Sequence, residues 1–193
     1  MDAILNPKKR SNKTLRVSRL TEHPLPPYSY VPRMHPHPVS DPVGHSYGIA
    51  GDTIDPTDEL AIRSGHDWAI DLFNYGYYWE SHEAWESIWH AFGGTGRQAN
   101  FVKGLIKLAA AGVKAREGRA VGVKRHVGRA IEIVDESANA DAGRSDSCMG
   151  LSYAWLRAQV QLIFDQPEAF VEDSHCDVMC VFPFSLVPEH PTS

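Results

Sequence analysis

The sequence predicts an all-α protein, a compact bundle of about five helices with extended proline-rich arms at both ends. Apolar residues recur at three- and four-residue spacing over most of the central region, which is the period of an amphipathic helix. Most of the thirteen prolines lie before residue 57, where they favour extended backbone. No β-hairpin pattern competes with the helices. We therefore expect an extended arm over residues 1–54, a helical bundle domain over 55–165 and an extended tail over 166–193.

The composition narrows the functional classes. A chain of 193 residues that is 42% hydrophobic suffices for one domain with a substantial core. Its net charge of -5 is mild and carries no footprint of a nucleic-acid-binding protein. The three cysteines form an odd set without an apolar signal region, so we expect a cytoplasmic protein. No stretch approaches the roughly 20 apolar residues of a membrane-spanning helix, so we expect no membrane partner.

The first two helices have recognisable ends. Asp55 suits an N-cap and Pro56 suits the first helical position, so the first helix is predicted to run from there to about Asn74. A second helix is predicted over residues 77–92, because the glycine-rich segment 93–96 would stop it.

Three further helices complete the predicted bundle. The third, over residues 97–117, is apolar around most of its circumference and is therefore expected at the centre. The fourth carries apolar residues at helical spacing over residues 123–138, and the fifth follows Ser147. The prolines beyond residue 182 favour an extended tail.

The segment 74–90 is the richest in reactive side chains. It holds three glutamates, two histidines, three tryptophans and three tyrosines. On a helical wheel most of the aromatic and small apolar residues fall in one arc, whereas Glu83, Glu86 and His90 lie opposite and His82 lies at the border. The segment is therefore predicted to have a packing face and an acidic face.

One interpretation of the acidic face is a metal-dependent hydrolase. His82 and Glu86 are four residues apart and can bind one divalent ion, with Glu83 as another ligand or as general base. Imidazole and carboxylate suit zinc, manganese or iron. A neighbouring helix would complete the shell, and His126 is one candidate, with His66, Asp67 and Asp71 as others. The spacing reproduces neither the His-Glu-x-x-His motif of zinc proteases nor the Glu-x-x-His motif of di-iron bundles.

The interpretation that we favour is a structural or oligomer-forming polar site. Residues 52–92 hold nine acidic residues and one arginine, whereas residues 97–129 hold nine basic residues and one glutamate. A lysine stripe on the third helix lies within reach of the acidic face, so the two would form an ion-paired seam. The stripe consists of Lys103, Lys107 and Lys114. The same complementarity between two chains favours a homodimer.

Two secondary expectations follow from the same charges. Glu80, Lys103, Lys107 and Arg97 are candidates for contacting a bound ligand. The basic face is an alternative nucleic-acid-binding surface, but acidic residues of the same chain or of a partner would neutralise much of it, so nucleic acid is the weaker expectation.

Paired motifs in this region resemble a known family. They are Asn74, Gly76, Glu80-Ser81-His82-Glu83, Glu86 and Trp89, followed by Arg97, the run from Phe101 to Ala111, and Gly118. This pattern, over about residues 58–135, resembles the domain-of-unknown-function 309 family. The resemblance implies a small helical bundle of the kind found in bacteria and archaea, and it implies no particular reaction. Lys103 and Lys107 stand where glutamine is more usual in that family.

Overall fold

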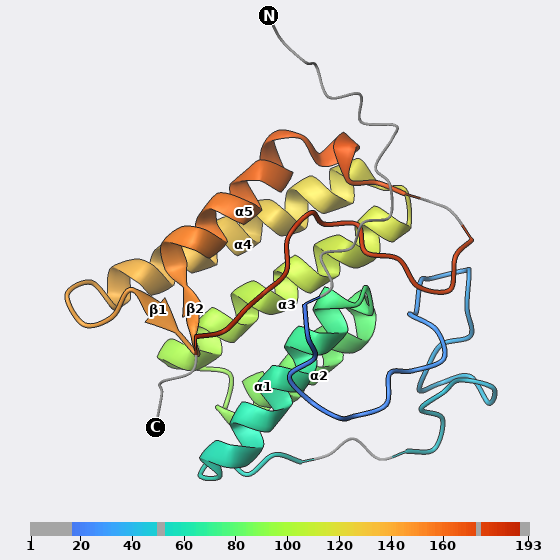
Figure 1. Cartoon of the computed structure of the whole chain (residues 1–193), viewed down its shortest axis with the longest axis horizontal. Coiled ribbons are helices and arrows are strands. Elements are labelled where there is room, and N and C mark those ends of the chain that lie inside the picture. The colour runs from blue at the N-terminus through green and yellow to red at the C-terminus, as the bar shows by residue number, and fades with distance from the viewer. Residues whose placement is uncertain (1–16, 50–52, 173–174, 190–193) are drawn as a thin grey trace, which may run out of the picture.

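A computed structural model describes residues 17–49, 53–172 and 175–189, so residues 1–16 of the predicted arm lie outside the described residues. Within the described part the protein is an all-α bundle, as predicted (Figure 1). Its helices are α1 (Glu59–Asn74), α2 (Tyr78–Ala91), α3 (Arg97–Arg116), α4 (Ala120–Ala140) and α5 (Tyr153–Asp165), followed by the short 3-10 helix η2 (Pro167–Ala169). None of these helices is long and apolar enough to cross a bilayer.

The start of α1 differs from the prediction. Asp58, and not Asp55, is the N-cap, and its side chain accepts a hydrogen bond from the Ala61 amide at 2.9 Å. Asp55 instead accepts from the amide and the hydroxyl of Thr57, in the turn before the helix. Both aspartates have the chemistry of a cap, and only Asp58 stands three residues before an amide of the first turn.

A two-stranded hairpin before α5 was not predicted. β1 (Ser147–Cys148) pairs antiparallel with β2 (Leu151–Ser152) across Met149 and Gly150, which both have positive φ. Two such residues form the tight turn that suits short hairpins, but methionine at the first position hides the signal. As a result α5 begins later than predicted, with Ser152 as its N-cap.

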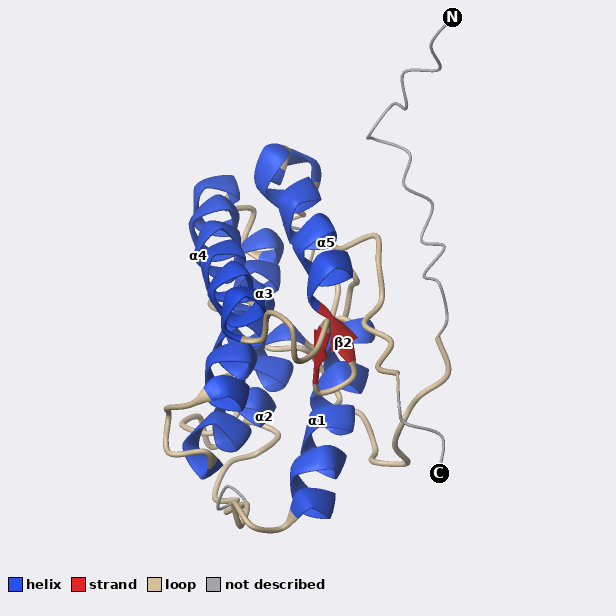
Figure 2. Cartoon of the chain, turned by 90° about the vertical axis from the view of Figure 1, so that its left-hand side faces the viewer, coloured by secondary structure: helices blue, strands red, loops and turns tan. Residues whose placement is uncertain are grey.

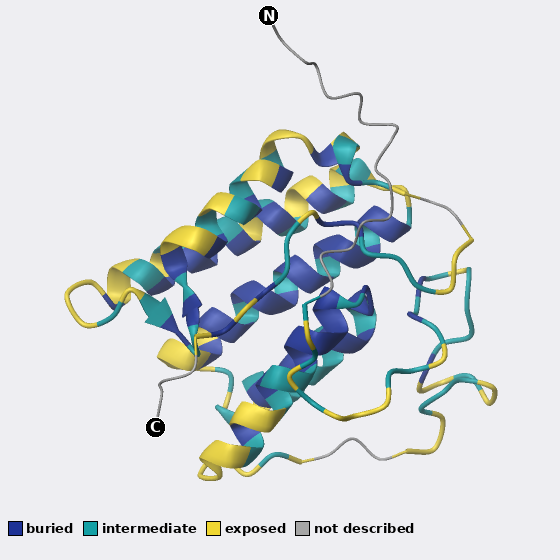
Figure 3. Cartoon of the chain, viewed as in Figure 1, coloured by how far each residue is buried: buried dark blue, intermediate teal, exposed yellow. Residues whose placement is uncertain are grey.

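The helices pack in the order of the sequence. α2 and α4 lie on either side of α3, α1 packs against α2, and α5 packs against α4 (Figure 2). Most residues of α3 are buried, which confirms its predicted central position (Figure 3). Gly112 of α3 permits this packing, because a Cβ there would lie 2.4 Å from the Tyr78 ring of α2.

Two non-helical segments lie on the helical body. We call residues 17–49 the N-terminal arm and residues 175–189 the C-terminal strap; in Figure 1 the strap crosses in front of α3. The strap adds Phe182 and Leu186 to the hydrophobic core, where the Phe182 ring lies 5.8 Å from that of Phe73. The amide side chain of Asn74 donates to the Leu186 carbonyl and accepts from the Leu186 amide, both at 2.8 Å. The strap is thus part of the core.

Candidate functional site

The two predicted faces of α2 are present. Tyr78, Trp85 and Ile88 are buried against the other helices. His82, Glu83 and Glu86 are half-buried and lie outside this core. Hydrophobic burial therefore fixes the rotation of α2 about its axis, and that rotation places the three polar side chains together.

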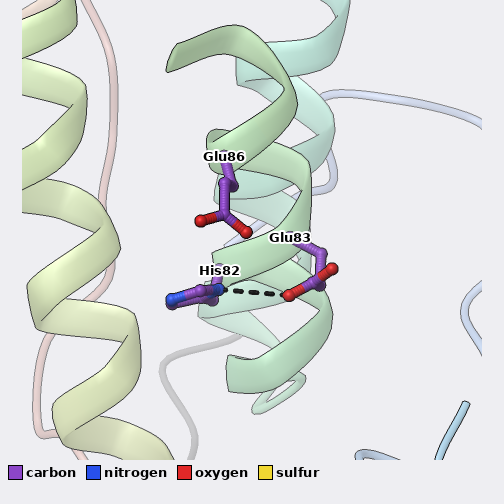
Figure 4. A group of neighbouring side chains, drawn as sticks. All are labelled: His82, Glu83 and Glu86. Atoms are coloured by element: carbon purple, nitrogen blue, oxygen red, sulfur yellow. Dashed lines mark ion pairs between the residues drawn. The ribbon is translucent and has the colours of Figure 1, made fainter. Parts of the chain in front are cut away.

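These three side chains form a compact cluster. One ligand atom from each lies within 4.8 Å of the others, and it is the one such group of three or more His, Cys, Asp or Glu side chains among the described residues. Nδ1 of His82 lies 3.4 Å from Oε1 of Glu83 (Figure 4). The contact lacks hydrogen-bond geometry, so the buried Nδ1 atom has no hydrogen-bond partner. We call these residues the α2 cluster.

Glu80, although it belongs to the same motif, is not part of the α2 cluster. Its side chain is buried and binds the N-terminal arm. Oε1 accepts a hydrogen bond from the Tyr30 amide at 2.8 Å, and Oε2 accepts one from the Ser29 hydroxyl at 3.4 Å. Nε2 of His45 lies 3.3 Å from Oε1. No local pattern could indicate this role, because the partners lie 35 to 51 residues away in the sequence.

Two polar residues of α1 that were candidates for completing a metal shell have other partners. Nδ1 of His66 accepts from Nε1 of Trp85 at 3.2 Å, and its Nε2 lies 3.2 Å from the Met149 carbonyl. Asp71 is buried and accepts from the backbone amides of Leu20 and Thr21 at 2.8 and 2.9 Å. Asp71 therefore holds the N-terminal arm, as Glu80 does.

The predicted ion-paired seam between α2 and α3 is not formed. Across the described residues, no ion pair joins Glu83 or Glu86 to Lys103, Lys107 or Lys114. Lys114 pairs with Glu117 at 2.8 Å, close to it in sequence. Lysine side chains are long enough to choose among several acids, so a shared stripe does not determine their partners.

Arg97, the remaining candidate for ligand contact, lines an open cavity of about 460 Å³ at the start of α3. Its Nε lies 3.2 Å from Oδ1 of the fully buried Asp141, which also accepts a hydrogen bond from the Tyr153 hydroxyl. The pKa of Tyr153 is raised, first by burial and then by its hydrogen bond to Asp141. Burial also raises the pKa of the nearby Cys148 thiol, which disfavours its thiolate form. No sequence motif indicated this network.

His126 on α4 is not one of the cluster residues. Its pKa is lowered to about 4, first by burial and then by the positive charges of Arg125, Lys107 and Lys114, with a last contribution from His82. The ring is thus neutral at neutral pH and feels charges from α2, α3 and α4. A role of His126 as a metal ligand therefore stays a prediction.

A family model supports the resemblance found in the sequence. The model described as "Domain of unknown function (DUF309)" matches residues 67–126. The matched segment is therefore similar to this family. It runs from the middle of α1 to His126 of α4 and contains the whole α2 cluster, whereas the N-terminal arm, the hairpin, α5 and the strap lie outside it. No curated protein and no solved structure matches the chain.

Proposed function

We propose that this protein binds a divalent transition-metal ion through His82, Glu83 and Glu86. The observation that carries the proposal is the convergence of one imidazole nitrogen and two carboxylate oxygens within 4.8 Å of one another. These are ligand types that zinc and manganese accept.

The spacing of the atoms supports this proposal. With metal–ligand bonds of about 2.1 Å, neighbouring ligands of a tetrahedral ion lie about 3.4 Å apart. The Nδ1 to Oε1 distance between His82 and Glu83 is 3.4 Å. Small side-chain rotations would bring Glu86 to the same spacing, because helical residues four apart share a face.

Charge also supports it. Glu83 and Glu86 are three residues apart on one helix, where like charges repel. No lysine or arginine pairs with either of them in the described part of the chain. A divalent cation would neutralise both carboxylates and would bind Nδ1 of His82, which has no hydrogen-bond partner.

Three protein ligands would leave a position for water, as in catalytic zinc sites. A bound metal would supply an activated water, so hydrolysis is the reaction class that we assign to the site. If His126 from α4 takes the place of Glu83 as the third ligand, Glu83, whose side chain is 43% exposed, acts as the general base.

The structural function expected from the sequence has its own support, on another part of α2. Glu80 binds the N-terminal arm through three groups, so we assign it a structural role.

Metal binding is tested by calorimetric titration of the full chain, stripped with chelator, with Zn²⁺ and with Mn²⁺. We expect about one ion per chain, and a roughly hundredfold weaker affinity for Glu86→Gln or His82→Ala, because each removes a ligand. Glu168→Gln, which changes an exposed acid outside the α2 cluster, is the matched control and should bind like the parent. The proposal fails if neither ion binds, or if both ligand variants bind as tightly as the control while circular dichroism shows them folded.

A further inference from the structure

Two exposed apolar side chains lie in surfaces of opposite charge. Val121 at the start of α4 is 86% exposed and Leu60 at the start of α1 is 79% exposed, the highest values among the large hydrophobic residues that the structure describes. A single exposed apolar residue is ordinary on a protein surface. The surroundings of these two give them significance.

Val121 borders a groove between α4 and α5. The groove has a volume of about 550 Å³, and Phe164 forms an aromatic part of its wall, packed close to Gly128 of α4. The Lys124 ammonium lies 5.1 Å from the centre of the Phe164 ring. No carboxylate pairs with Lys124 or Arg125 within the described residues. We call this the basic groove; it is lined by Ala120, Val121, Lys124, Arg125, Gly128, Arg129, Glu132, Phe164, Pro167 and Glu168.

Leu60 belongs to a surface of the opposite charge, residues 55–60, which we call the acidic tip. Every residue of the tip is exposed, and three are acidic: Asp55, Asp58 and Glu59. Hydrogen bonds from Thr57 lower the pKa of Asp55, which keeps it ionised. The Asp58 cap on Ala61 fixes the tip to the helix. The tip is thus a short, ordered, acidic segment with one apolar side chain at its end.

We propose that the basic groove receives the acidic tip of a second copy of this chain. Leu60 would enter the groove beside Phe164, and Glu59 would face Lys124 and Arg125. The tip and the groove lie at opposite ends of the bundle in Figures 1 and 2. Two copies placed antiparallel therefore form two identical contacts, and a pair closed in this way needs no further copies.

The lining of the groove favours this occupant over a nucleic acid. Glu132 and Glu168 also line the groove, and Arg129 is paired with Glu132 at 2.6 Å. A run of phosphates would meet these carboxylates, whereas a segment with one leucine and a few fixed acids can place its charges beside Lys124 and Arg125 alone. A groove of this size can enclose one apolar side chain and its neighbours, which a flat surface cannot do.

The test is a charge exchange between tip and groove, measured by sedimentation equilibrium of the full chain. Glu59→Lys and Lys124→Glu should each weaken self-association about tenfold, because each places like charges in both contacts of the pair. An equimolar mixture of the two variants should associate like the parent protein, because both contacts in the mixed pair join opposite charges. Arg144→Glu, an exposed change in the turn after α4, should leave association unchanged.

Three results would overturn the proposal. They are a parent protein that stays monomeric at several hundred micromolar, a Leu60→Ser variant that associates as tightly as the parent, and a mixture that associates no better than its components. A labelled 20-nucleotide single strand provides the other arm of the test. If it binds the monomeric parent and is lost with Lys124→Glu, the groove belongs to nucleic acid and the second copy is excluded.

Discussion

Glu80 and Glu86 lie on the same helix, six residues apart, and have opposite environments. Glu80 is 7% exposed, and donors from the N-terminal arm surround its carboxylate. Glu86 is half-buried and, within the described residues, has no hydrogen bond or ion pair. The difference shows that one acidic motif contains two kinds of carboxylate. One already has partners in the fold, and the other lacks them and lies beside His82.

The largest expected loss of stability follows from replacing Glu80. Glu80→Ala should lower the free energy of unfolding by about 2–4 kcal/mol, because it leaves the Tyr30 amide and the His45 ring without their acceptor. Urea unfolding followed by circular dichroism measures this. Glu86→Ala is the matched comparison and should cost about 0.5 kcal/mol or less. Equal losses in the two variants would remove the distinction between them.

A bound metal ion should depend on Glu86 and not on Glu80. At a free concentration one hundred times the dissociation constant, the ion that binds should stabilise the protein by about 2.7 kcal/mol, or roughly 5–10 °C in melting temperature. Glu80→Gln should keep this shift, because Glu80 is not in the α2 cluster, while Glu86→Gln should lose it. Differential scanning calorimetry with and without chelator measures both. A shift that survives Glu86→Gln would place the ion elsewhere.

His126, whose ring is influenced by the charge of His82 in the α2 cluster, should make the unfolding free energy depend on pH. Its folded-state pKa of about 4 lies below the ordinary 6.5. Unfolding therefore takes up a proton between these values, and this contribution to stability, present above about pH 6.5, is lost as the pH falls toward 4. After allowance for solvent screening of the half-buried ring, the loss is about 1 kcal/mol. His126→Gln should flatten the profile of unfolding free energy against pH in this window, and an unchanged slope would contradict it.

The smallest effect is expected for Glu83→Gln in the presence of chelator. Within the described residues, the Glu83 side chain contacts one charged group, Nδ1 of His82 at 3.4 Å, and it is partly exposed, so the unfolding free energy should change by less than about 0.5 kcal/mol. A small gain in stability would fit relief of the repulsion with Glu86. Chemical denaturation against the parent chain checks this, and a loss above 2 kcal/mol would show that Glu83 is structural as Glu80 is.

Local patterns predicted the helices well, because helical periodicity is a property of neighbouring residues. The central position of α3 followed from its apolar circumference, and the grouping of His82 with Glu86 followed from their spacing. The role of Glu80 could not be predicted, since its partners reach it only after the arm has folded back over the bundle. The ion-paired seam predicted from the lysine stripe is absent for a related reason. Lys114 has Glu117 close to it in the sequence, and a flexible lysine side chain can pair with whichever acid lies nearest.

The hydrogen bonds between Asn74 and Leu186 can form only late in the synthesis of the chain. These two residues are 112 positions apart. At about 5–20 residues per second, the ribosome makes Leu186 roughly 6–22 s after Asn74. During that interval Phe73 and Tyr78 lack the Phe182 ring that covers them in the finished protein. The nascent chain therefore carries an uncovered aromatic surface, to which chaperones would bind until the strap emerges.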